Sequence, residues 1–293
     1  MIIVVLMGGL GNQLFQYAAA RSLADRTMGA LRFDLSAMGR HSTTRPFLLH
    51  HFRVRGAVTR VMSQEFLCAT LKSPISRLMQ RHYRRCMHYC FTEMKEKPDL
   101  RFEPALLAAR GNVVLSGYWQ SETYFADDAV RIRGDLALRH EPDAATRACL
   151  RQIRQCDSVS IHVRRGDYVS DQQTAAFHGI CSVEYYHGAM RHIAARIERP
   201  QFFVFSDDPE WARANIRSSV PTTYVSHNDA TRPHEDLRLM SACKHHIIAN
   251  SSLSWWGAWL NPAMDKIVVA PRRWCLSPEW NTTNVVPASW VRI

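Results

Sequence analysis

Short apolar runs alternate with helix-like segments in the first half of the chain. Residues 2–6 are all apolar, and a glycine-rich turn follows them. Residues 13–26 then predict a helix, because apolar side chains recur on or near one helical face. Residues 113–115 predict another buried strand. A strand, a turn and a helix in this order open an α/β unit.

From Asp157 onwards the pattern sharpens into strands that end in polar turns. In residues 158–163, apolar and polar side chains alternate, as they do in a strand. Further strands are predicted over residues 202–205, 246–249 and 267–270, and the helix-like segment SWWGAWL follows the second of these. Strands that alternate with helices predict parallel sheets. The fold class is therefore α/β.

The length and composition suggest two folded domains. The chain has 293 residues, and a domain commonly takes roughly 150 residues. We place the boundary in the charged, helix-like stretch before the first clear strand of the second half, which gives domains at residues 1–155 and 156–293. Hydrophobic residues make up 46% of the chain and charged residues 22%, which argues against disorder.

The net charge of +11 predicts an acidic partner. Nucleic acid, anionic lipid and a phosphorylated small molecule all fit such a charge. No nucleic-acid partner is expected, because the chain lacks a recognised binding motif and its aromatic residues do not interleave with the basic stretch at residues 72–91. A nucleotide-binding module without catalysis is a further alternative.

Cysteine usage and hydropathy favour a cytoplasmic protein. The eight cysteines form no Cys-x-x-Cys pair, and Gly8 and Gly9 interrupt the first apolar run before it reaches the length of a signal peptide. Reduced thiols are therefore expected. No run reaches the ~18 apolar residues that a membrane span needs. A protein that acts on membrane-bound material would then visit the inner face of the cytoplasmic membrane without crossing it.

The strongest candidate site follows the strand at residues 158–163. Ligands bind beyond the carboxyl ends of parallel strands, and the sequence there is HVRRGD. Arg164 and Arg165 are permanently charged, and each guanidinium can donate two hydrogen bonds to the oxygens of a pyrophosphate. Asp167 could orient an arginine or accept a hydrogen bond from a nucleotide. The alternative is a surface ion pair between Arg165 and Asp167.

A second candidate is the loop GGLGNQ at residues 8–13. Glycines let backbone N–H groups approach a phosphate. The loop matches neither the dinucleotide fingerprint, because Leu14 replaces its third glycine, nor a P-loop, because no Lys-Ser/Thr pair follows. An ordinary tight turn with Asn12 near the helix cap is the alternative.

Two further strand ends carry polar residues. Ser251 and Ser252 precede a helix, where hydroxyls and free N–H groups suit an anion; simple N-capping is the alternative. Asp208 before Pro209 predicts a helix N-cap and hence a structural role. Asp207 is then free to meet a ribose hydroxyl or a base amine.

A metal site is not expected. His82, Cys86, His88 and Cys90 lie close together but match no standard zinc spacing. Basic side chains crowd this stretch without an acidic one, and they are Lys72, Arg77, Arg81, Arg84 and Arg85. Such a stretch predicts a basic surface that is solvated or touches anionic lipid. No Asp-x-Asp motif occurs anywhere in the chain.

Five blocks in order resemble the bacterial α-1,2-fucosyltransferase family: GGLGNQLFQYA, GYWQSETYF, HVRRGDYV, FSDD and IIANSSLSWWGAWLN. The resemblance runs from Gly8 to Asn261, with a poorly matched middle. It implies a GT-B-like fold in which two Rossmann-like domains face a cleft, with the donor in the C-terminal domain and the acceptor on the N-terminal side. It also implies transfer of L-fucose from GDP-β-L-fucose to the 2-hydroxyl of a galactose, with inversion and without a cofactor or metal.

The resemblance also assigns roles to residues. The expected donor-binding residues are His162, Arg164, Arg165, Asp207, Ser251, Ser252 and, by looser analogy, Asn12 and Gln13. Arg164, Arg165 and Asp167 are the expected catalytic residues, because without a metal the arginines must stabilise the charge on the departing phosphate. The general base stays unassigned among Asp167, Glu235 and Asp236.

The acceptor and the exact donor stay open at this point. A galactose-containing O-antigen repeat, a capsule and a free oligosaccharide all fit as acceptors. A lipid-linked acceptor would suit the basic stretch and a peripheral membrane contact. A related GDP-sugar transferase with a different linkage or donor is the main alternative, because groups that bind phosphate do not recognise the sugar.

Overall fold

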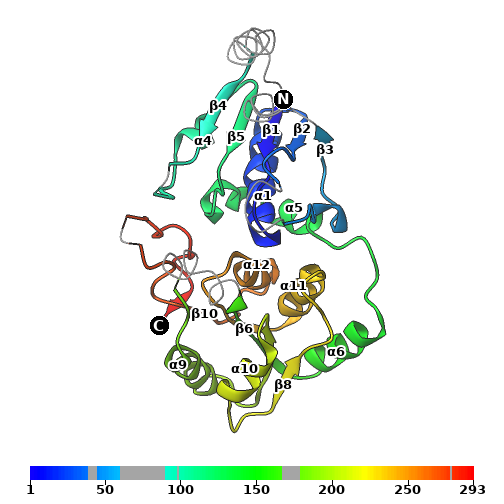
Figure 1. Ribbon diagram of the computed structural model, residues 1–293, viewed down its shortest axis with the longest axis vertical. Coiled ribbons are helices and arrows are strands. Elements are labelled where there is room, and N and C mark those ends of the chain that lie inside the picture. The colour runs from blue at the N-terminus through cyan, green and yellow to red at the C-terminus, as the bar shows by residue number, and fades with distance from the viewer. Residues whose placement is uncertain (39–44, 60–89, 98, 167–178, 278) are drawn as a thin grey trace, which may run out of the picture. The chain divides into compact units, whose positions relative to one another are not determined.

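The computed structural model describes residues 1–38, 45–59, 90–97, 99–166, 179–277 and 279–293 (Figure 1). The chain forms two compact units, Met1–Ala137 and Leu138–Ile293. Each unit contains one parallel sheet. These two sheets confirm the predicted α/β class with two Rossmann-like domains.

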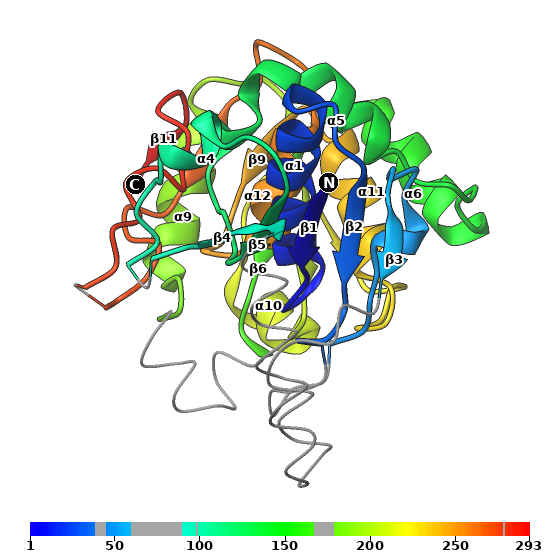
Figure 2. The same cartoon turned by 90° about the horizontal axis from the view of Figure 1, so that it is seen from above.

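The N-terminal sheet has the strand order β3-β2-β1-β5-β4, and all of its strands are parallel (Figure 2). Its strands are β1 (Ile2–Val5), β2 (Leu31–Asp34), β3 (Ala57–Thr59), β4 (Thr92–Lys95) and β5 (Val113–Ser116). The predicted strands at residues 2–6 and 113–115 are confirmed. The sequence did not predict β2, β3 and β4, because each is short and carries exposed or polar residues.

The helix predicted at residues 13–26 is confirmed as α1 (Leu10–Arg26), and it begins three residues earlier than expected. It packs on β1 and β2 and is buried along most of its length. The remaining helices of this unit are short. They are α4 (Ala105–Ala108), α5 (Ala129–Asp135) and the 3-10 turns η1 (Leu49–His51), η2 (Glu122–Tyr124) and η3 (Ala126–Asp128).

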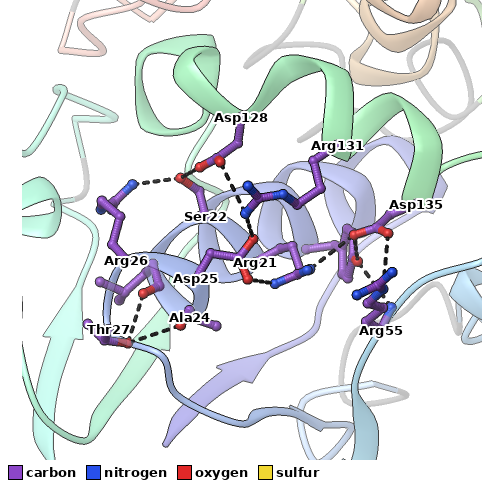
Figure 3. A network of polar contacts seen from close by, with 12 residues as sticks. Arg21, Ser22, Ala24, Asp25, Arg26, Thr27, Arg55, Asp128, Arg131 and Asp135 are labelled. Atoms are coloured by element: carbon purple, nitrogen blue, oxygen red, sulfur yellow. Dashed lines mark hydrogen bonds and ion pairs between the residues drawn. The ribbon is translucent and has the colours of Figure 1, made fainter.

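A polar network joins α1 to α5 on the flank of the N-terminal unit (Figure 3). Asp135 Oδ2 accepts hydrogen bonds from Tyr17 Oη at 2.8 Å and from Arg21 Nε at 3.0 Å. Arg55 lies 3.7 Å from the other carboxylate oxygen. Arg21 also pairs with Asp25 one turn further along α1. Burial raises the pKa of Tyr17, and the neighbouring carboxylate adds to that effect, so its hydroxyl stays a donor.

The C-terminal sheet has six parallel strands in the order β11-β10-β9-β6-β7-β8. Their bounds are β6 (Asp157–Val163), β7 (Pro200–Ser206), β8 (Thr222–Val225), β9 (His245–Ile247), β10 (Val268–Ala270) and β11 (Val291–Arg292). All four strands predicted in this half are confirmed. The edge strands β8 and β11 were not predicted.

Helices cover both faces of this sheet, as Rossmann-like folds require. The apolar side of β6 packs against α9 (Val183–Ala194) and α10 (Pro209–Asn215). The other face packs against α6 (Ala144–Arg154) and α11 (Pro233–Ala242). The predicted helix SWWGAWL is α12 (Ser252–Leu260).

The division between the units falls earlier than the expected boundary after residue 155. Helix α6 lies in the C-terminal unit, because Cys149, Leu150 and Ile153 join the core that includes Phe203 and Phe205 of β7. The charged surface of α6 suggested a linker, whereas its buried stripe makes it part of the second core. Among the described helices, none combines the length and the apolar character that crossing a bilayer requires.

Candidate functional site

The strand order of the C-terminal sheet places its ligand site beside β6. From β6 the chain continues to β7 and β8 on one side and then returns to β9 on the other. Such a switch point leaves a crevice at the carboxyl ends of the strands. The residues that follow β6, β7 and β9 there are Arg164, Asp207 and the turn 250–252. Three of the predicted polar strand ends therefore belong to neighbouring strands.

Asp207 fixes the backbone and the side chains that follow β6. Its Oδ2 lies 3.0 Å from Arg164 Nη1, and its Oδ1 accepts the Arg165 backbone N–H at 2.8 Å. A Cβ on Gly166 would lie 2.7 Å from Asp207 Oδ2, so the glycine lets the carboxylate approach. Both oxygens of Asp207 therefore support the arginine turn in this structure, and its contact with a ribose or a base stays a prediction.

Arg165 is held from two sides. Its Nε lies 3.2 Å from Asp208 Oδ2, and its guanidinium carbon lies 3.9 Å from the centroid of the Trp211 ring. Asp208 Oδ1 also accepts the Trp211 backbone N–H at 3.2 Å, which confirms the predicted N-cap before Pro209. The Nη nitrogens of Arg165 make no hydrogen bond to another described residue. They remain available for an anion.

Trp211 is a site residue that the sequence analysis missed. The sequence offered one indication of this role: an aromatic residue lies in the first turn of the helix that begins at the SDDP turn. Stacking on an aromatic face fixes a guanidinium plane at little cost in hydration. Together with Asp208, it gives Arg165 one orientation before a ligand arrives.

His162 lies at the end of β6 and is 5% exposed. Burial lowers its pKa to about 4; the charge of Arg164 adds to this effect, while Asp207 opposes it. The ring is therefore neutral near pH 7. Its Nδ1 is buried without a hydrogen-bond partner among the described residues, and the backbone carbonyl accepts from Tyr186 Oη at 3.2 Å. His162 can offer a donor bond through a neutral imidazole but no positive charge.

The turn before α12 supplies backbone donors. Ser251 is buried at the N-cap position, and its hydroxyl makes no capping hydrogen bond, so the capping alternative does not apply to it. Ser252 begins the helix and is partly exposed. Asn250 holds this turn in place, because its Nδ2 donates to the carbonyls of Gly179 and Trp274 at 3.2 and 3.3 Å. The three tryptophans of α12 lie in the core.

Asn12 and Gln13 lie in the N-terminal unit, and only Asn12 is partly exposed. Gln13 is fully buried. Its Nε2 donates to the carbonyls of Gly8 and Pro46 at 3.0 and 2.9 Å, and its Oε1 accepts from Leu48 N at 2.9 Å. Its amide therefore holds two loops together in this structure, and the predicted donor contact of Gln13 stays a prediction.

The described candidates for a general base have structural partners. Glu235 is buried and pairs with Arg238 at 2.8 Å. Asp236 accepts from Asn228 Nδ2 at 2.8 Å, and burial raises its pKa to about 6. Asp167 lies outside the described residues, so its expected catalytic role stays a prediction.

The candidates for metal or lipid binding lie mostly outside the described residues. His82, Cys86, His88 and nearly all of the basic stretch at residues 72–91 belong to that part of the chain. Within the described ranges, no group of three or more His, Cys, Asp or Glu side chains could hold a metal ion.

The arrangement after β6 is suited to an anion. Two guanidiniums are fixed by two carboxylates beside a helix N-terminus, and a fixed guanidinium binds oxygens with little loss of side-chain freedom. The aspartates also balance part of the charge of the arginines. Groups arranged in this way can stabilise charge that develops during a reaction.

Comparison with known proteins identifies the family. A family model described as "Glycosyl transferase family 11" matches residues 1–293. Alpha-1,2-colitosyltransferase of Escherichia coli is 31% identical over 293 residues, which cover 100% of this chain and 98% of that protein. The O-antigen biosynthesis glycosyltransferase WbnK of Escherichia coli is 31% identical over 319 residues, covering 98% of this chain and 99% of that protein.

More distant relatives agree with this result. Galactoside alpha-(1,2)-fucosyltransferase 1 of Homo sapiens is 29% identical over 261 residues, covering 86% of this chain and 63% of that protein. A structure of Arabidopsis thaliana FUT1 in complex with GDP has a TM-score of 0.52 at 10% identity, covering 95% of this chain and 71% of that one. At this identity the likeness concerns the fold alone. The predicted family is confirmed, and the chain belongs to glycosyl transferase family 11.

Proposed function

We propose that this chain transfers L-fucose from GDP-β-L-fucose to the 2-hydroxyl of a galactose residue in a glycan, with inversion and without a metal. The observation that carries the proposal is the pair Arg164 and Arg165, fixed by Asp207 and Asp208 at the switch point of the C-terminal sheet. The names of two relatives support the linkage, since both the colitosyltransferase and the human enzyme are α-1,2-transferases.

The reaction breaks the bond between the sugar C1 and the β-phosphate oxygen while the acceptor O2 bonds to C1 from the opposite face. The electron pair of the broken bond goes to GDP, and the proton of the acceptor hydroxyl goes to a base that stays unassigned. Negative charge grows on the β-phosphate as the bond lengthens. Arg165, with its Nη nitrogens directed by Asp208 and Trp211, donates to that charge together with Arg164.

His162 supports this step through its neutral ring. A buried imidazole without a positive charge can hydrogen-bond to the donor without binding the GDP product too tightly. The N–H groups at the start of α12, next to Ser251 and Ser252, supply further donors for a phosphate.

A second donor is favoured by one specific observation, the 31% identity to an alpha-1,2-colitosyltransferase over the whole chain. Groups that bind phosphate do not distinguish one deoxy sugar from another. The relative WbnK, an O-antigen biosynthesis glycosyltransferase, supports an O-antigen glycan as the acceptor. Contact with the inner membrane surface through residues 72–91 stays a prediction.

The test is to incubate the protein with GDP-fucose and a panel of β-galactosides, and to determine the linkage of the product by NMR. An α-1,2-linked fucoside is the expected product. A colitosyl donor is tested in parallel, and faster transfer from it would assign the second donor instead. Activity that disappears in EDTA and returns with Mn²⁺ would contradict a reaction that depends on arginines alone.

A further inference from the structure

A strained loop follows β5 in the N-terminal unit, and the donor site does not account for it. From β1 the chain runs to β2 and β3 on one side and reaches β5 on the other, so β1 and β5 flank the switch point of this sheet. The loop 117–120, with the sequence GYWQ, starts where β5 ends. Ligands bind at such points in open parallel sheets.

One half-buried carboxylate holds this loop. Glu96 follows β4, and its Oε2 accepts the Tyr118 backbone N–H at 2.6 Å. Its Oε1 accepts the Trp119 backbone N–H at 2.8 Å, and the Gln120 backbone N–H also bonds to the carboxylate. Three consecutive backbone donors therefore converge on a single side chain. Burial raises the pKa of Glu96, although these three bonds oppose that shift.

The loop adopts a conformation that it would not hold by itself. Trp119 has a φ of 57° and is fully buried, and a bulky residue in the left-handed region is strained. Gly117 has a φ of 155°, and a Cβ there would lie 2.3 Å from Glu96 Cβ. Strain of this kind persists only where the surroundings fix it, and it concentrates at ligand clamps. Glu96 is the group that fixes it here.

The held loop presents an amide pair. Gln120 Nε2 donates to Asn12 Oδ1 at 2.9 Å, and both side chains are partly exposed. Gly8 makes room for this pair, because a Cβ there would lie 2.5 Å from Asn12 Nδ2. In the described part of the chain, Asn12 Nδ2 and Gln120 Oε1 make no other hydrogen bond. A donor and an acceptor thus stand side by side.

We propose that Glu96 is a positioning residue for the acceptor: it fixes the loop 117–120 so that Gln120 and Asn12 hydrogen-bond to neighbouring hydroxyls of the acceptor's terminal sugar. The inference rests on the proposed transferase function. A neutral amide pair suits sugar hydroxyls, which both donate and accept, better than it suits a phosphate. The carboxylate acts through the loop, because its oxygens are occupied by backbone N–H groups.

The test compares Glu96→Gln with the control Glu93→Gln. Glu93 lies on β4, is exposed and pairs with Lys95 at 3.2 Å. In Glu96→Gln, the KM for the galactoside acceptor should rise by about tenfold, the effect of a lost hydrogen bond to a ligand. The KM for GDP-fucose and its hydrolysis without acceptor should stay unchanged. Glu93→Gln should behave as wild type.

Gln120→Ala keeps the test decisive if Glu96→Gln does not fold, because it removes only a partly exposed side chain of the amide pair. It should raise the acceptor KM to a similar extent, and the double variant should be no worse than Glu96→Gln. Unchanged acceptor KM in the folded variants overturns the inference, as does a parallel loss of donor hydrolysis.

Acceptor binding separates this inference from the proposed function. Saturation-transfer NMR with a β-galactoside and GDP detects binding without any transfer. Binding that is present in wild type and weakened in Glu96→Gln and Gln120→Ala supports the inference, even if fucose is not the sugar transferred. Equal binding in all of these proteins overturns it, even if the wild type forms the expected fucoside.

Discussion

Each unit contains a buried or half-buried Arg–Asp pair with the same separation, yet the two pairs have different surroundings. Arg21 Nε lies 3.0 Å from Asp135 in the N-terminal unit, and their side chains are 10% and 8% exposed. Arg164 Nη1 lies 3.0 Å from Asp207 in the C-terminal unit, and both side chains are 23% exposed. The first pair joins two helices, whereas the second follows two neighbouring strands.

The position of each pair along its α/β unit explains the difference. Arg21 lies eleven residues after the start of α1, so at 1.5 Å per residue it is about 16 Å from the ligand-binding edge of its sheet. Its guanidinium contacts Asp135 and Asp25 (Figure 3). Arg164 lies directly at the carboxyl edge of its sheet, where a ligand can reach it. The same chemistry therefore stabilises the fold in one unit and is expected to bind substrate in the other.

Removing the arginine at the strand end should have the largest effect. Arg164→Ala should lower kcat by on the order of 10²–10³, the usual cost of losing a preorganised contact to a developing charge. The free energy of unfolding should change by less than about 1 kcal/mol, because the pair is partly solvated. Steady-state kinetics with GDP-fucose and a β-galactoside measures the first value, and urea unfolding measures the second.

Arg217→Ala is the matched control, since this exposed arginine lies in the same unit just after α10, outside the strand ends. It should retain full activity. If Arg164→Ala and Arg165→Ala both had wild-type kinetics, the assignment of phosphate binding to this turn would be wrong.

Breaking the Arg21–Asp135 pair between α1 and α5 should lower the free energy of unfolding and leave the catalytic rate unchanged. Asp135→Asn removes the carboxylate charge that Arg21 and Tyr17 contact. Removing one partner of a buried pair costs about 3 kcal/mol, and the loss here should be smaller because Arg21 keeps its pair with Asp25. Calorimetry should show a lower melting temperature for the variant. At a temperature where the variant is folded, its kcat should equal that of wild type.

Asp99→Asn supplies the comparison for this prediction. Asp99 pairs with the exposed Arg101 at 3.3 Å, and surface pairs contribute about 0–1 kcal/mol. Folded Asp135→Asn should be as active as Asp99→Asn. A larger loss of activity in Asp135→Asn would mean that the Arg21–Asp135 pair is not purely structural.

The neutral His162 predicts a smaller, pH-dependent effect in the C-terminal unit. Its folded pKa of about 4 lies below the ordinary value of 6.5, so below pH 6.5 the unfolded chain binds a proton that the folded chain does not. The contribution of neutral His162 to the free energy of unfolding is complete above pH 6.5 and is lost as the pH falls toward 4. Between pH 7 and pH 5 this loss amounts to about 2 kcal/mol.

Urea unfolding followed by tryptophan fluorescence measures this effect, because seven of the eight tryptophans lie in the C-terminal unit. His162→Gln should be less sensitive to acid than wild type, while the exposed His140→Gln should match wild type. His162→Gln and wild type must be compared directly with each other. Burial raises the pKa of Asp236 to about 6, and that shift makes the folded protein more stable as the pH falls, which opposes the effect of His162. Identical pH dependence in His162→Gln would contradict the buried, neutral state of the ring.

Local sequence patterns were sufficient for the elements and for part of the site. Alternating apolar residues located β6 and β7, and the motif HVRRGD located the arginines at the end of β6. Asp208 and Pro209 predicted a helix cap that the structure confirms. These features depend on residues that are close along the chain, so their spacing alone reveals them.

Only the tertiary structure decided how distant residues are paired. Gln13 bonds to the loop at Pro46 and Leu48, and Glu96 binds the loop after β5 more than twenty residues later. Asp207 reaches back 42 residues to the Arg165 backbone, and this bond makes it a support for the arginines. The sequence by itself determined which polar groups stand at strand ends. The order of strands in each sheet determined which of them meet, because hydrogen bonding between strands brings together residues that no local pattern connects.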